Sequence, residues 1–128
     1  MAPRFDLERV QEAARDGRIS LTRKRALDHL TPFIPTWEGC RSFAIDVICQ
    51  LRPTDFYETR EQRDTCDVYG VELPLELLEK HGVPEDCRTW YVKFTVQEGN
   101  VRGDLVVFIS LHRLEWSMEA FVEGAQRG

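Results

Sequence analysis

Two segments near the C-terminal end alternate apolar and polar residues, the pattern of a β-strand with one buried face. In residues 90–96 the even-numbered positions are large and apolar, and Tyr91 and Lys93 lie between them. In residues 105–112 the odd-numbered positions are apolar, and His112 ends the opposite face. If the two strands pair as a hairpin, the phenol, the ammonium and the imidazole share one face of a sheet.

Apolar residues at three- and four-residue spacing predict helices in the first half of the chain. The first helix covers residues 6–17, with Asp6 as its N-cap and Gly17 at its end. A second helix is expected to be capped by Thr22, and a third spans residues 36–51. Each of the three has an apolar stripe, which indicates that it packs against a core.

The second half of the chain has the composition of a sheet. Aromatic and β-branched residues predict strands at 56–61 and 65–73. A short helix is expected at 74–82 and a last helix at 114–122. Residues 18–21 alternate over too short a stretch to decide between an edge strand and an extended link. Helices followed by strands predict an α+β fold, in which N-terminal helices pack on one face of a small antiparallel sheet.

This layering leaves the polar face of the sheet accessible. We expect Glu58 and Arg60, at alternate positions of the first long strand, to join Tyr91, Lys93 and His112 there. These residue types can supply what cleavage of an RNA phosphodiester needs. A base takes the proton of a ribose 2′-hydroxyl, an acid protonates the leaving 5′-oxygen, and cations stabilise the phosphorane. Such a reaction requires no metal.

Length and hydropathy indicate one domain that does not enter a membrane. The chain has 128 residues, enough for a single core, so we expect one domain over residues 1–128. No apolar run approaches the ~20 residues of a membrane span. Residues 1–6 lack the apolar segment of a signal peptide, so the expected location is the cytoplasm.

Charge is distributed unevenly along the chain. The net charge is −5, yet residues 1–31 hold seven Lys/Arg and five Asp/Glu. A basic patch in this part contains Arg18, Arg23, Lys24 and Arg25. Two interpretations are open: the patch guides an RNA strand by its phosphates, or it is the solvated start of a helix. An acidic protein that handles RNA is expected to do so through a local cleft.

The cysteines and the other histidines suggest structural roles. Cysteines at positions 40, 49, 66 and 87 form no Cys-x-x-Cys pair and have no histidine at zinc-ligand spacing. We therefore expect reduced thiols, no metal site and no cofactor. His29 and His81 are assigned surface or capping roles, and Tyr69 is placed on the side facing the helices.

Several segments resemble the MqsR family, the toxins of bacterial type II toxin–antitoxin pairs. The resemblance is carried by VICQLRPTDFY at residues 47–57, by Asp-Val-Tyr at 67–69 and by YVKFTV at 91–96. It extends over about residues 6–73 and 89–112. Compared with the family, residues 74–88 resemble an insertion and residues 113–128 a C-terminal extension.

The resemblance implies a RelE-like fold, metal-independent cleavage of messenger RNA, and a cognate antitoxin of the zinc-ribbon plus helix-turn-helix type. Of four positions at which the family has active residues, the chain keeps only the tyrosine, Tyr91. Glu58 and His112 stand where the family has lysines, and Cys66 stands where it has a glutamine. His112 retains acid–base capacity near neutral pH, and Arg60 can restore the cation lost at Glu58.

The sequence therefore predicts a small endoribonuclease toxin, an mRNA interferase. In this hypothesis Tyr91 and His112 share proton transfer, with Glu58 as a further candidate base. Arg60 and Lys93 neutralise the phosphate, and the basic patch guides the strand. The alternative is a catalytically inactive MqsR-like fold that acts as a protein- or RNA-binding module, as the three substituted positions favour.

Overall fold

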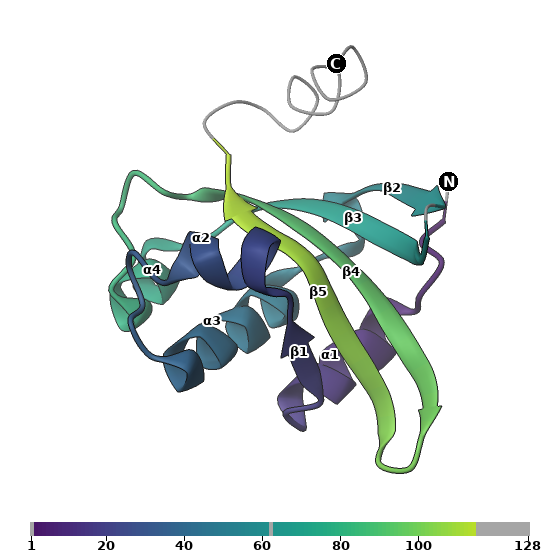
Figure 1. The fold of residues 1–128 in the computed structure, drawn as a ribbon. Helices are drawn as coiled ribbons and strands as arrows, with labels where there is room; N and C mark the ends of the chain where they lie inside the picture. Colours follow the sequence, from purple (N-terminus) through teal and green to yellow (C-terminus); the bar gives the residue numbers. More distant parts are fainter. Residues whose placement is uncertain (1, 62, 115–128) are drawn as a thin grey trace.

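The computed structural model describes residues 2–61 and 63–114 and has an α+β fold (Figure 1). Its helices are α1 (Leu7–Arg15), α2 (Asp28–Leu30), α3 (Trp37–Gln50) and α4 (Leu75–His81). A π-helical turn, η1 (Arg23–Leu27), leads into α2, and a 3₁₀ turn, η2 (Pro53–Asp55), precedes the first long strand. The strands are β1 (Ile19–Leu21), β2 (Phe56–Glu61), β3 (Thr65–Glu72), β4 (Thr89–Asn100) and β5 (Gly103–Arg113).

The five strands form one mixed sheet in the order β1-β5-β4-β3-β2. The pairs among β2, β3, β4 and β5 are antiparallel, as the sequence predicts. β1 pairs parallel to β5, with Ile19 opposite Val106, so the expectation of an entirely antiparallel sheet is wrong at this edge. Three alternating residues indicate a strand but contain no information about its partner or direction.

The predicted helix ends are confirmed where a side chain caps the helix. Asp6 accepts a hydrogen bond from the backbone N–H of Glu8 at the start of α1. Thr36 does the same for Gly39 at the start of α3. Thr22 instead donates its hydroxyl to the carbonyl of Ile109 in β5, 2.8 Å away. The second helix therefore begins without a side-chain cap. It consists of a π-helical turn and one short α-helix, and its start is bonded to the end of the sheet.

A single buried cluster joins the helices to the sheet. α1 contributes Val10 and Ala14, α3 contributes Phe43 and Val47, and the sheet contributes Trp90, among others. Aromatic rings add directional contacts, since the Phe43 and Trp90 rings meet edge to face at 5.1 Å. The indole N–H of Trp90 is satisfied within the core, because it donates to the carbonyl of Cys87 at 2.6 Å.

A β-bulge changes the face assignment in β5. Lys93 pairs with Ser110 and Phe94 pairs with Phe108, which leaves Ile109 as the extra residue. The buried apolar positions of the strand are consequently Val106, Phe108 and Leu111, and Ser110 is buried beside Lys93 on the opposite face. The prediction that all odd-numbered positions from 105 to 111 share the core face is wrong, apart from Leu111. Strict alternation cannot account for an inserted residue, and the bulge shifts the phase by one.

The predicted tail helix at 114–122 lies almost entirely outside the described residues. The short helix expected at 74–82 is present as α4, and Gly82 ends it in the left-handed conformation, with φ of 70°. Within the described part of the chain, no helix is long and apolar enough to cross a membrane.

Candidate active site

The strand register brings the five predicted site residues to one face of the sheet. Tyr91 lies opposite His112, Lys93 lies opposite Val68, and Val68 in turn lies opposite Glu58. Arg60 is two positions beyond Glu58 on the same strand. Directly paired residues share a face, so the predicted shared placement is confirmed. The chemical roles of these residues stay predictions.

Three aromatic rings lie together at the end of β5 that faces α2. The rings of Tyr91 and His112 are nearly parallel, at 14°, with centroids 5.0 Å apart. The ring of His29, from α2, is tilted by 43° relative to that of His112, and the two centroids are 5.1 Å apart. The short α2 segment lies beside the end of β5 (Figure 1), and this position allows the contact between the two histidine rings.

The sequence assigns His29 a surface or capping role, and the residue is exposed, but sequence reasoning did not place it in the candidate site. One signal was present: Arg25 and His29 are four residues apart, so in a helical turn they project in the same direction. In the structure both are exposed, and both influence the charge state of His112. What the sequence could not provide is the position of this turn against the end of β5.

Glu58 and Arg60 form an ion pair on the same face. The Nε of Arg60 donates to Oε1 of Glu58, and their side chains are 25% and 22% exposed, respectively. This hydrogen bond raises the pKa of Arg60, so its cation is permanent. The carboxylate of Glu58 is engaged by the guanidinium, which makes Glu58 a weaker candidate for the base.

Tyr91 and Lys93 lie beneath the surface of the candidate site. Their exposures are 6% and 5%, so the expectation of a fully accessible polar face is wrong at these two positions. Burial raises the pKa of the Tyr91 phenol and lowers the pKa of the Lys93 ammonium. The two side chains form the floor of the site, whereas Arg25, His29 and half-buried His112 form its rim.

The environment of His112 favours the neutral imidazole. Burial is the largest cause of a lowered pKa, and the positive charges of His29 and Arg25 lower this pKa further. A hydrogen bond with the backbone of Arg113 acts in the opposite direction. That bond joins Nδ1 to the Arg113 carbonyl oxygen at 3.1 Å. Since a carbonyl can only accept, Nδ1 donates, and the neutral ring has its basic lone pair on Nε2.

The predicted basic patch is divided by the fold. Arg23, Lys24 and Arg25 are exposed on η1, and Arg25 is close enough to lower the pKa of Lys93 as well as that of His112. Arg18 lies before the opposite end of β1. Its guanidinium donates to Asp16 at 2.7 Å and to the carbonyl of Asp104 at 3.1 Å. Arg25 therefore belongs to the candidate site, and Arg18 does not.

The Asp-Val-Tyr element has a structural role. Asp67 is fully buried and accepts hydrogen bonds from the backbone N–H groups of Arg4 and Phe5, both at 2.9 Å. Its Oδ1 also accepts a bond from the Thr59 hydroxyl at 2.6 Å. Tyr69 faces the core, as predicted, and its ring stacks on that of Phe94 at 5.7 Å. In this part of the MqsR resemblance, Asp67 and Tyr69 thus stabilise the fold from the core side of the sheet, and Val68 lies on the opposite face.

Cys66 occupies the position at which the MqsR family has a glutamine. It is buried beneath the same face, and burial raises the pKa of its thiol. A thiol with a raised pKa stays protonated at neutral pH and is a poor nucleophile. All four cysteines are free, and we assign none of them to the chemistry.

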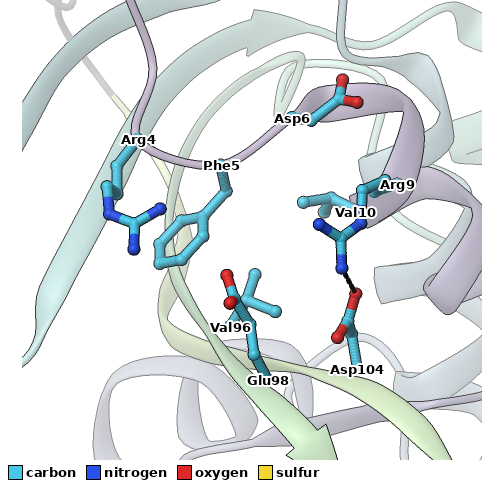
Figure 2. A pocket seen from close by; sticks show the side chains of 8 residues that line it. All are labelled: Arg4, Phe5, Asp6, Arg9, Val10, Val96, Glu98 and Asp104. Carbon is cyan, nitrogen blue, oxygen red and sulfur yellow. Dashed lines mark hydrogen bonds and ion pairs between the residues drawn. The ribbon is translucent and has the colours of Figure 1, made fainter.

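A separate pocket of about 170 Å³ opens where the N-terminal segment and α1 meet the β4–β5 hairpin (Figure 2). Val96 lines it from the core side of β4, so it lies across the sheet from Tyr91. Arg9 points across the pocket and binds Asp104 at 2.6 Å, while Glu98 adds a second carboxylate. Paired and opposing charges make this pocket unsuitable for a polyanion such as RNA.

No protein-family model matches this chain, and the comparison with curated proteins finds no match. The resemblance to MqsR toxins therefore stays a prediction that rests on the segments quoted above.

Proposed function

We propose that this protein is a metal-independent endoribonuclease of the MqsR type, with a RelE-like fold. One observation carries the proposal: an imidazole whose environment favours its neutral form stands at an accessible rim close to an exposed guanidinium. These are His112 and Arg25, and the guanidinium of Arg60 lies on the same face of the sheet, near Tyr91. A neutral base next to fixed positive charge suits attack of a ribose hydroxyl on its own phosphodiester.

In the proposed reaction, Nε2 of His112 removes the proton from the 2′-hydroxyl. The 2′-oxygen forms a bond to phosphorus, and the bond from phosphorus to the 5′-oxygen breaks. Arg25 and Arg60 stabilise the negative charge of the phosphorane. The 5′-oxygen takes up a proton as it leaves, so the products are a 2′,3′-cyclic phosphate and a free 5′-hydroxyl. Tyr91 supports the imidazole through its parallel ring, and its raised pKa makes the phenol a poor proton donor.

The toxin role extends this proposal to partners and location. A cognate antitoxin, a messenger RNA substrate and a cytoplasmic setting all follow from the MqsR resemblance. The helix packing expected of a RelE-like fold is supported by the shared core of α1, α3 and the sheet. The divided basic patch supports RNA entry over η1, where Arg23, Lys24 and Arg25 are exposed.

The test is incubation of the purified full-length protein with a long single-stranded RNA in EDTA. We expect cleavage by the wild type and a loss of about 10²–10⁴-fold in His112→Ala, the usual contribution of a general base. Arg60→Met should also be slow, whereas Arg102→Met, at the exposed hairpin tip, should cleave normally. Tyr91→Phe keeps the stacking ring and should retain most of the activity. Intact RNA with the wild type would refute the proposal.

Burial of part of the predicted site favours a second candidate function. With Tyr91 and Lys93 covered and Glu58 paired with Arg60, the same rim can bind an RNA phosphate without cleaving it. A non-catalytic binding module would retain RNA in a gel-shift assay and lose this binding in Arg25→Ala. Cleavage would be absent in both the wild type and His112→Ala.

A further inference from the structure

We infer that His29 is the general acid that protonates the leaving 5′-oxygen. The inference rests on the proposed function. It assigns the proton transfer to the leaving 5′-oxygen, for which the residues predicted from the sequence supply no accessible donor. It makes the reaction a two-histidine mechanism, with base and acid supplied by β5 and α2 respectively.

The geometry places two imidazoles side by side at the rim of the same site. Their ring centroids are 5.1 Å apart and their planes are inclined by 43°. A catalytic acid or base must reach within about 2.6–3.2 Å of the oxygen it serves. Two neighbouring rings inclined to each other can reach two oxygens of a single phosphodiester. His29 is exposed, so an RNA strand has access to it.

The electrostatics favour a neutral His112 beside a charged neighbour. A positive charge on His29 lowers the pKa of His112. Among the described residues, Arg25 from η1, which also lowers this pKa, and Tyr91 from β4 also face His112. An imidazolium and a neutral imidazole form an acid and a base that are ready together.

The proton balance of the step is complete. His112 gains the proton of the 2′-hydroxyl as the bond from the 2′-oxygen to phosphorus forms. The His29 imidazolium loses a proton to the 5′-oxygen as the bond from phosphorus to that oxygen breaks. Afterwards His112 is charged and His29 is neutral, and exchange with water restores the starting state.

The experiment compares two RNAs of identical sequence around a mapped cleavage site. One has the natural 5′-oxygen at the scissile bond and the other has sulfur, which leaves as a thiolate without needing a proton. We expect His29→Ala to slow cleavage of the oxygen RNA about 10²–10⁴-fold and to leave cleavage of the sulfur RNA close to wild type. His112→Ala should slow both. The control Asp28→Asn changes the exposed neighbour of His29 and should behave as wild type.

Each contrary result has a distinct meaning. Wild-type cleavage of the oxygen RNA by His29→Ala would overturn the inference and leave the proposed nuclease intact. Equal slowing of both RNAs would also overturn it, because it would show that His29 positions the substrate and does not donate a proton. A wild-type protein that cleaves neither RNA would contradict the proposed function, and the inference would fall with it.

Discussion

Removal of the Asp67 carboxylate should cost more stability than any other single polar change in the described residues. Three donors converge on its two oxygens: the backbone N–H groups of Arg4 and Phe5, and the Thr59 hydroxyl. A hydrogen bond to a charged group contributes about 1.5–3 kcal/mol, and such contributions are not additive. Asp67→Ala removes the shared acceptor of all three donors at a fully buried position, so we expect a loss of about 3–5 kcal/mol.

Two milder variants should lose less stability, because each removes only part of this hydrogen-bonding group. Asp67→Asn keeps the side-chain volume but has one acceptor oxygen, and its amide then faces a backbone donor, so we expect a loss of about 1–3 kcal/mol. Thr59→Val removes one donor and should cost about 1–2 kcal/mol. Because Asp67 and Thr59 are bonded, the double variant should lose less than the sum of the single changes.

The assay is urea denaturation monitored by tryptophan fluorescence, since Trp90 is buried in the core. Denaturation midpoints are compared between variants whose free energy of unfolding has the same slope against urea concentration, so that a shifted midpoint reports a change in stability alone. A loss below about 1 kcal/mol in Asp67→Ala would refute the argument. It would show that the carboxylate does not hold the N-terminal segment to the sheet.

Three other predictions concern single groups. The hydroxyl of Tyr69 is buried without a hydrogen-bond partner among the described residues, and burial raises its pKa to about 12. Tyr69→Phe should therefore leave the free energy of unfolding unchanged or increase it by up to about 1 kcal/mol; a loss above that in urea denaturation would contradict this. Burial alone would raise the pKa of Asp46, but hydrogen bonds from Lys80 and His81 outweigh it and lower this pKa. A carboxylate whose pKa is lower in the folded state stabilises the fold above its unfolded pKa of about 3.9. This stabilisation is lost as the pH falls through the folded-state pKa. Asp46→Asn should thus lower the melting temperature at pH 7 by about 4 °C, or about 1 kcal/mol, with little difference at pH 2. Arg25→Met should raise the pKa of His112, measured by NMR titration of its ring, because a positive neighbour is removed; an unchanged value would place Arg25 outside the site.

Local sequence patterns were sufficient to predict most of the helices and strands. Capping residues and apolar spacing located α1 and α3, and alternation located the long strands, because these signals depend only on near neighbours in the chain. They were also sufficient to place Tyr91 and His112 together, since hairpin partners have a nearly fixed register.

What the sequence could not provide depends on contacts between distant segments. The bulge at Ile109 and the parallel pairing of β1 are decided by how strands fit together. The burial of Lys93 likewise depends on neighbouring strands, with Val68 and Ser110 beside it. His29 entered the site only through the position of α2 against β5. The sequence thus predicted a shared face, and the structure distinguished its floor from its rim.

The most direct test of the account is chemical analysis of the RNA ends produced by the wild-type protein in EDTA. We predict 2′,3′-cyclic phosphate and 5′-hydroxyl ends, and complete protection of a site whose scissile nucleotide lacks the 2′-hydroxyl. Continued cleavage at that 2′-deoxy nucleotide would contradict the central claim, because His112 would then have no ribose proton to remove.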